Sequence, residues 1–396
     1  MNRRRFLESA SAALMIASAF SGGAGATAAR ESAQVAGAVP KLAGTPYPLV
    51  ALPTKQPMGQ VYDIPPNYET PTPHLIGTKN YPMTDNEYYY VRYREAMPAQ
   101  LEPATFRLKI SVDAVEHPAE FSLADLRALP QVKLGAVGEC TGLGRGLLRP
   151  MVPGLPWTKG DVSCAEWTGA SLATLLKQVG VKPDAKMVTF KSGANTISKK
   201  KPAYIRAYQP ESVLTPDAML AFGMNGEDLN FWNGYPLRLV VPGTYAPSWV
   251  KQLVEIEIRT TEDPGEWSGR PIGKGLLKTY SLITEPIDGT QVPAGSIADL
   301  RGVAWDHGQG IEKVEISADE GKTWEEAALE PSVGRYVWRV FTHSVTIAKP
   351  GQTRILSRAT SADGTTQPMD VAPEIIQNGG RQNNAIDTFA AILIGS

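Results

Sequence analysis

Hydrophobic and polar positions follow helical and strand periods in turn over the middle of this chain. Apolar residues at every other position predict a strand at Phe106–Val112. Leu172–Val179 has helical spacing and is followed by Gly180, which predicts a helix that ends there. Ser122 begins a second short helix pattern, which Pro130 ends. Strands are also predicted at Tyr88–Val91 and Leu237–Val241. Because the alternation lacks a regular βαβ rhythm, the fold class predicted here is mixed α+β.

The helical pattern stops after about residue 280. Beyond it the pattern predicts strands at Val314–Ser317, Tyr336–Val340 and Thr353–Leu356, with turn signals at Asp319–Lys322 and Asp363–Gly364. Short strands at this spacing are typical of a β-sandwich. The sequence therefore predicts an immunoglobulin-like β-sandwich over residues 280–396.

The N-terminal residues have the pattern of an export signal. Three arginines at Arg3–Arg5 precede Phe6 and Leu7, and a largely apolar run extends from Ala10 to Phe20. That run is too short to span a bilayer but suits a secretory signal. Residues 1–28 are thus predicted to be a twin-arginine signal peptide, which implies a periplasmic protein. The Pro-rich residues 29–80 are predicted to form an extended N-terminal arm.

Composition excludes several classes of protein. The formal net charge is −1, so there is no broad basic surface for nucleic acid. No other segment is long and apolar enough to cross a membrane, so no membrane contact is expected after signal cleavage. With two cysteines and four histidines, a zinc site of Cys and His is hard to assemble. The sequence has no Cys-x-x-Cys-His motif for covalent haem.

The two cysteines have two open interpretations. Cys140 and Cys164 would form a disulfide in an oxidising compartment. Alternatively, Cys140 is a metal-binding thiolate on a strand-to-loop turn, and the glycines of residues 137–146 give a bulky cofactor room to approach. A single soft thiolate suits a redox metal that is held mainly by an organic cofactor.

Several cationic residues are candidates for binding an anion. Arg92 and Arg94 occupy alternate positions, so both side chains face one side if this stretch is a strand. Arg145 follows Cys140 on the glycine-rich loop, while Arg238 and Lys251 lie further along the chain. Arginine binds oxyanions with two parallel hydrogen bonds, whereas lysine acts as a point charge. Taken one at a time, a residue of this kind is more often a solvated surface charge than part of a binding site.

Short motifs in a fixed order resemble the sulfite oxidase family of molybdopterin enzymes. They are Tyr90–Arg92, Cys140–Gly142, Trp167–Leu172, Met224–Gly226, Asn233–Gly243 and Trp249–Lys251, followed by Gly302–Trp305, Val314–Ser317 and Gly321–Trp324. Within the family, the Asn233–Arg238 motif is similar to that of the bacterial, haem-free branch, which includes the molybdenum subunit of sulfane dehydrogenase. The resemblance implies a molybdopterin-binding oxidoreductase domain over 81–270 and an immunoglobulin-like dimerisation domain over 280–396.

The resemblance also implies roles for individual residues. Cys140 would be the protein ligand of molybdenum, which makes Cys164 a structural residue. Arg92 and Arg145 would bind the substrate oxyanion beside the metal. The residues implied to line the pterin and its phosphate are Tyr93, Arg94, Asn233, Arg238, Trp249, Val250 and Lys251.

The implied activity is that of a periplasmic, homodimeric molybdenum-molybdopterin oxidoreductase. It would oxidise sulfite or a related sulfur compound or oxyanion and pass electrons to a c-type cytochrome. Two departures affect the substrate: Arg94 replaces the usual histidine, and no tyrosine follows directly after Trp267, Tyr280 lying further on. A reductase of sulfoxides or other oxygenated substrates, and a metal-free binding module on the same fold, remain as alternatives.

Overall fold

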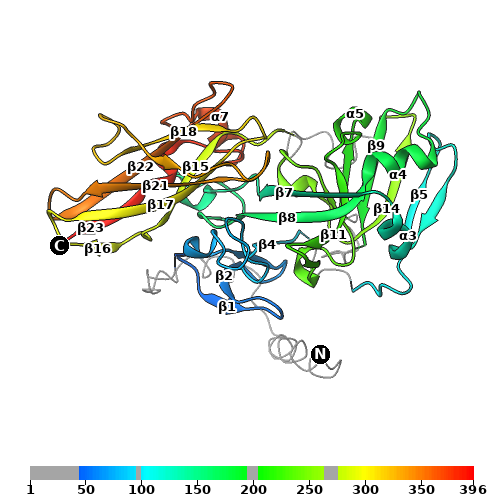
Figure 1. The fold of residues 1–396 in the computed structure, drawn as a ribbon, viewed down its shortest axis with the longest axis horizontal. Coiled ribbons are helices and arrows are strands. Elements are labelled where there is room, and N and C mark those ends of the chain that lie inside the picture. The colour runs from blue at the N-terminus through cyan, green and yellow to red at the C-terminus, as the bar shows by residue number, and fades with distance from the viewer. Residues whose placement is uncertain (1–43, 95–99, 194–203, 263–274) are drawn as a thin grey trace, which may run out of the picture. The chain divides into compact units, whose positions relative to one another are not determined.

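The structure is a computed structural model that describes residues 44–94, 100–193, 204–262 and 275–396 (Figure 1). The predicted signal peptide at 1–28 and the first part of the predicted arm lie outside the described residues. Within the described ranges, no helix is long and apolar enough to cross a membrane. All of these residues belong to one compact unit, Pro40–Ser396.

The described part of the predicted arm contributes three strands to a small sheet, and a strand beyond the arm supplies the fourth. Its strands pair antiparallel in the order β1 (Leu49–Ala51), β2 (Pro57–Tyr62), β3 (Asn67–Glu69) and β4 (Val91–Arg92). A single 3-10 turn, η2 (Thr72–His74), follows the prolines. The strand predicted at Tyr88–Val91 is largely wrong, because the amides of Tyr88 and Tyr89 both donate to the carbonyl of Asp85 and the backbone turns there. Pairing begins only at Val91.

Two five-stranded sheets form the first domain. One has the order β10 (Ile205–Tyr208), β9 (Met187–Ser192), β14 (Leu253–Arg259), β5 (Leu108–Ser111) and β6 (Ala119–Phe121), with only β14 and β5 parallel. The other has the order β12 (Glu227–Asp228), β11 (Met219–Met224), β8 (Val162–Ser171) and β7 (Gln131–Glu139), and β13 (Arg238–Val240) also pairs with β11. The predicted strands at 106–112 and 237–241 are present as β5 and β13.

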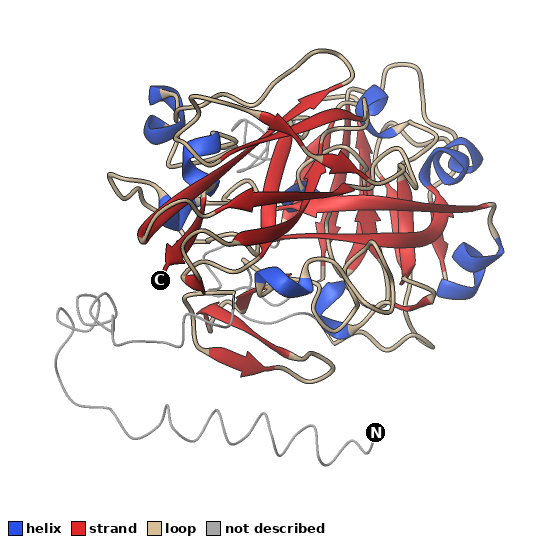
Figure 2. Cartoon of the chain, turned by 60° about the vertical axis from the view of Figure 1, so that its left-hand side comes forward, coloured by secondary structure: helices blue, strands red, loops and turns tan. Residues whose placement is uncertain are grey.

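Short helices lie beside these sheets, and Figure 2 shows how little of the chain is helical. The predicted helices are confirmed as α3 (Leu123–Ala128) and α4 (Leu172–Val179). Ser122 and Asp125 form a reciprocal capping box at the start of α3. Ser171 caps α4, which buries four apolar side chains and ends at Gly180. The other helical turns are α5 (Pro210–Val213), η3 (Arg145–Leu147), η4 (Phe231–Asn233) and η5 (Ala246–Ser248).

Residues 280–396 form the predicted β-sandwich. The first sheet has the order β15 (Tyr280–Glu285), β17 (Ile297–Trp305), β21 (Arg339–Thr346) and β20 (Ala328–Leu329). The second has the order β16 (Thr290–Val292), β23 (Ala391–Gly395), β22 (Gly351–Ser361), β18 (Ile311–Ser317) and β19 (Glu325–Glu326). Two helical segments complete the domain, α7 (Pro373–Gln377) and η6 (Ile386–Phe389). The mixed first domain followed by a sandwich confirms the predicted fold class.

The sandwich holds the strand that leads to Cys140. The carbonyl of Tyr336 accepts from the amide of Val137 in β7, so the strand predicted at Tyr336–Val340 joins the sandwich sheet only from Arg339 onward. One hydrophobic core contains residues of both domains, including Cys164 and Trp305. Because β7 ends at Glu139, these contacts fix the position of the next residue, Cys140.

Candidate functional site

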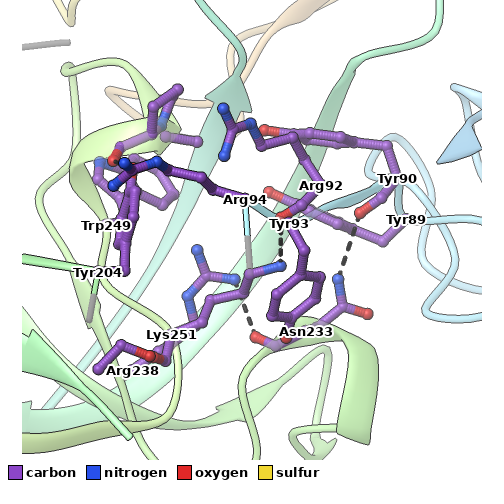
Figure 3. A pocket seen from close by; sticks show the side chains of 13 residues that line it. Tyr89, Tyr90, Arg92, Tyr93, Arg94, Tyr204, Asn233, Arg238, Trp249 and Lys251 are labelled. Atoms are coloured by element: carbon purple, nitrogen blue, oxygen red, sulfur yellow. Dashed lines mark hydrogen bonds between the residues drawn. The ribbon is translucent and has the colours of Figure 1, made fainter. Parts of the chain in front are cut away.

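A pocket gathers most of the residues predicted to bind the cofactor (Figure 3). It is lined by Tyr89, Tyr90, Arg92, Tyr93, Arg94, Ser192, Tyr204, Asn233, Arg238, Ala246, Pro247, Trp249 and Lys251. The lining comes from the turn around β4, from η4 and the start of β13, from η5 and the residues after it, and from the ends of β9 and β10. Folding thus joins segments that are separated by more than a hundred residues.

The charged residues of the lining are all cationic: Arg92, Arg94, Arg238 and Lys251. Arg238 is only 4% exposed and packs over the rings of Trp167 and Trp249 at 4.7 and 5.8 Å. Its Nη1 donates to the carbonyl of Asn233 at 2.9 Å, and it has no carboxylate partner among the residues the structure describes. Burial lowers the pKa of this guanidinium. A buried charge of this kind favours an anionic ligand that would offset its desolvation.

Lys251 and Tyr93 form the second part of the pocket. The Lys251 ammonium lies 3.3 Å from the centre of the Tyr93 ring and donates to the carbonyls of Arg92 and Trp232. The Tyr93 hydroxyl donates to the side chain of Gln252 at 3.1 Å. Lys251 therefore ties the β4 segment to η4 while its positive charge stays beside the pocket.

Cys140 lies at the end of β7 and is buried. Its amide donates to the carbonyl of Asp161 at 3.0 Å. Burial raises the pKa of its thiol to about 11, and Asp161 adds to the shift, while Arg92, the amide of Gly142 and Arg145 oppose it. Such a thiol becomes a thiolate when a metal ion supplies the compensating charge.

The structure separates the two arginines that were predicted to bind the substrate. Arg92 lines the pocket, as does Arg94. Arg145 is buried outside the lining, and its guanidinium donates to the carbonyls of Gly379 and Leu155 at 2.8 and 3.2 Å. Arg145 consequently acts on Cys140 through its charge rather than from the pocket wall.

The structure also shows where Val250, the two cysteines and Tyr280 lie. Val250 is fully buried in the core, outside the pocket lining, and contributes its carbonyl to the amide of Leu239. Cys140 and Cys164 are both free, so the disulfide interpretation is wrong. Tyr280 stacks on Trp305 inside the shared core, away from the pocket.

The glycines after Cys140 make room for the protein itself, not for a cofactor. Gly144 has a φ of +75°, and a Cβ there would lie 2.5 Å from the ring of Phe389. A Cβ on Gly146 would lie 2.3 Å from the carbonyl oxygen of Pro156. The loop therefore needs glycine because other segments of the chain pack closely against it.

Sequence reasoning missed one residue behind the lining, Lys55, and six lining residues: Tyr89, Tyr90, Ser192, Tyr204, Ala246 and Pro247. The run Tyr88–Tyr90 indicated only a strand, although three consecutive tyrosines also suggest an aromatic wall. Lys55 lies in the predicted arm, and its ammonium donates to the side chain of Asn233 at 2.7 Å. No local pattern marks such a lysine, because its partners lie far away in the sequence.

The residues present fit an anionic organic cofactor that also carries a metal. The Nε of Arg238 and the hydroxyl of Tyr89 are buried polar atoms with no hydrogen-bond partner in the described part of the chain. A ligand rich in acceptor atoms would satisfy such groups. Among the described residues, no three His, Cys, Asp or Glu side chains group closely enough to hold a metal ion. With Cys140 as the protein ligand that the resemblance implies, the other donors to a metal would come from the cofactor.

Comparison with known proteins assigns both domains. Residues 94–267 match the oxidoreductase molybdopterin binding domain, and residues 275–385 match the Mo-co oxidoreductase dimerisation domain. These two domains in this order define a molybdopterin oxidoreductase, and they imply the molybdenum cofactor. The predicted resemblance is confirmed: the chain has the two domains of molybdopterin oxidoreductases and is homologous to sulfite oxidases.

The curated relatives include mitochondrial sulfite oxidase of Rattus norvegicus, 29% identical over 76% of this chain and 60% of that protein. Sulfite oxidase of Gallus gallus is 29% identical over 74% of this chain and 69% of that protein. This chain thus spans between about three fifths and seven tenths of these two relatives. The sulfane dehydrogenase SoxCD from Paracoccus pantotrophus shares the fold, with a TM-score of 0.69, 23% identity and 96% of each chain covered.

Proposed function

We propose that this protein is a periplasmic, molybdenum-dependent oxidoreductase that oxidises sulfite or a related sulfur compound and passes the electrons to a c-type cytochrome. The observation that carries the proposal is a pocket whose charged lining residues, within the part of the chain that the structure describes, are four cations and no carboxylate. Cys140 lies outside this lining, but the charge of one lining residue, Arg92, acts on its buried thiol. Such a lining suits both an anionic cofactor and a small oxyanion substrate. The names of its relatives, sulfite oxidases and a sulfane dehydrogenase, support the substrate class.

Each part of the pocket has a distinct task in this proposal. When bound, the molybdenum cofactor supplies the two-electron redox chemistry. Cys140 would be its ligand from the protein. Arg238, Lys251 and the Asn233 side chain would hold the anionic parts of the pterin, because their donors converge on the pocket from two segments.

Arg92 and Arg94 would attract the substrate. Oxidation of sulfite to sulfate takes an oxygen atom from water and releases two protons and two electrons, so both substrate and product are anions. An arginine does not lose its charge at any physiological pH, whereas the family's histidine does. Arg94 therefore gives this pocket a positive charge that is independent of pH.

Metal and pterin content test the proposal directly. The chain purified from its native export route is expected to contain about one molybdenum and one oxidisable pterin per chain. Steady-state assays then compare sulfite with ferricyanide as acceptor against sulfoxides with a reduced dye as donor. A folded chain without stoichiometric molybdenum would refute the enzyme proposal in favour of a binding module. Turnover of sulfoxides alone would reverse the proposed direction.

Location and assembly have separate tests. Replacing Arg4 and Arg5 by lysine should keep the protein in the cytoplasm if the twin-arginine route exports it. The sandwich is proposed to form the homodimer, in line with its match to a dimerisation domain. Light scattering that reports a monomer at micromolar concentration would contradict this.

Reduction of a purified c-type cytochrome by the protein and its substrate would support the proposed acceptor.

A further inference from the structure

Lys55 is a buried lysine that the predicted roles do not include. It lies between β1 and β2, outside both matched domains, and is 7% exposed. Its ammonium donates to the carbonyls of Asn86 and Tyr89 at 2.7 and 2.8 Å and to Oδ1 of Asn233 at 2.7 Å. Three oxygen acceptors thus match the three protons of an ammonium group.

All three partners of Lys55 belong to segments that build the pocket. Tyr89 and Asn233 are themselves lining residues, and Asn86 belongs to the turn that precedes β4. Lys251 joins the same two segments from the other side, through the carbonyls of Arg92 and Trp232. Two lysines from distant parts of the chain therefore hold the β4 segment against η4.

The contact with Lys55 also decides how the Asn233 amide points. Because Oδ1 accepts from the ammonium, the amide nitrogen must face the other way. There it lies 3.5 Å from the carbonyl of Tyr90, a long and weak hydrogen bond. The Asn233 nitrogen is therefore available as a donor to a ligand in the pocket, and Figure 3 shows it among the lining side chains.

A lysine in this position is costly without a purpose. Burial lowers the pKa of Lys55 well below its usual value, and the charge of Glu87 opposes the shift only in part. Among the residues described, no carboxylate forms a salt bridge with Lys55. A neutral side chain of similar length would fill the space without the desolvation cost of a charge. An anion in the adjoining pocket would offset that cost.

We infer that Lys55 is a positioning residue of the cofactor pocket: it fixes the Asn233 amide and supplies a buried positive charge, so the N-terminal arm is part of the binding site. This inference rests on the proposed assignment of the pocket to the molybdenum cofactor. It gives the arm a task that neither matched domain performs.

The test compares Lys55→Met and Lys55→Gln with Lys79→Met. Lys79 is a surface lysine of the same region, and its ammonium pairs with the Glu87 carboxylate. Pterin and molybdenum content, and the rate at which pterin leaves the purified protein, are measured for each holoprotein. Lys55→Met is expected to retain about tenfold less cofactor than wild type, and Lys79→Met to stay within about twofold. Retention at the wild-type level in Lys55→Met would overturn the inference.

Two further variants separate positioning from folding. Lys55→Gln is one bond shorter but keeps an amide group that can donate two hydrogen bonds, so it should fold and still lose cofactor, since it lacks the charge. Asn233→Ala should weaken retention, and adding Lys55→Met to it should cause a smaller loss than Lys55→Met causes alone, because the part of the effect that passes through the Asn233 amide is already gone. Fully multiplicative losses would show independent action and contradict the inference. A wild-type protein without pterin would instead refute the proposed function itself.

Discussion

The contact between the sandwich and the residue before Cys140 can be tested with Trp305→Phe. Trp305 is 1% exposed and stacks on Tyr280 with ring centres 5.0 Å apart. Its indole Nε1 donates to Oε2 of Glu139 at 2.9 Å, across the boundary between the two domains. Phenylalanine keeps a ring in the core but removes both the donor and part of the buried surface. The variant is expected to destabilise the protein without preventing folding.

The expected loss of stability follows from the missing indole donor and the smaller buried surface. Burial raises the pKa of Glu139 to about 8, so near pH 7 its carboxyl accepts mainly as a neutral acid. Leaving a buried neutral acceptor without its donor costs about 1–3 kcal/mol. The smaller ring gives up roughly 40 Å² of buried apolar surface, or about 1 kcal/mol. The free energy of unfolding should therefore fall by about 2–4 kcal/mol.

Trp324→Phe provides the matched control. The Trp324 indole also donates to an oxygen, the carbonyl of Gly321 at 3.0 Å, but this side chain is only partly buried on the sandwich. Water can replace the lost donor there, so the cost should be under about 1 kcal/mol. Guanidinium unfolding followed by tryptophan fluorescence and far-UV circular dichroism measures both variants. Equal destabilisation by the two substitutions would refute a special role for the contact with Glu139.

Four further predictions follow from single residues. Cys140→Ser should lose molybdenum and activity, whereas Cys164→Ser, which also buries a hydroxyl, should keep the metal. Normal turnover by Cys140→Ser would rule out Cys140 as the ligand. Arg238→Met should leave the cofactor-free protein at least as stable in thermal unfolding, since it removes a buried charge without a carboxylate partner, yet reduce pterin retention by about tenfold. Ser171→Ala should cost about 1 kcal/mol in unfolding experiments through the lost cap of α4. Hydrogen bonds from the amides of Thr323 and Lys322 and from two hydroxyls lower the pKa of Asp319 to about 2. The stability that ionised Asp319 contributes is therefore fully present above the pKa of aspartate in the unfolded chain, and it is lost as pH falls through about 2. The difference in melting temperature between wild type and Asp319→Asn should shrink over that interval.

Local chemistry explains which elements could be predicted from sequence. The two confirmed helices carry their own start and stop signals, Ser122 with Asp125 for α3, and Ser171 with Gly180 for α4. The strand expected at Tyr88–Val91 failed because a carbonyl three residues earlier, that of Asp85, draws the backbone into a turn. The sandwich strand expected from Tyr336 begins later because a strand of the other domain takes that carbonyl. Hydrogen bonds between distant segments leave no mark in a local pattern.

The candidate site, too, could be predicted from the sequence only in part. Residue type and order were enough to predict that Arg92, Arg238 and Lys251 lie together, and the structure does bring them into one pocket. They could not show that Arg145 turns its guanidinium toward the carbonyls of Gly379 and Leu155. Side-chain direction at such a residue depends on loops that close over it only in the folded protein.

The cations in and around the pocket share one property that bears on how the pocket binds an anion. Lys55, Arg145, Arg238 and Lys251 all donate to uncharged oxygens, mostly backbone carbonyls, and no carboxylate pairs with the first three among the residues described. A carbonyl fixes the position of a cation without cancelling its charge, whereas a salt bridge would neutralise it. A chain with a net charge near zero can thus keep a strongly positive interior at one site. Because carbonyls cannot be removed by side-chain substitution, each of these cations should stay in place when a neighbouring one is replaced, so single substitutions should weaken anion binding in steps rather than collapse the pocket.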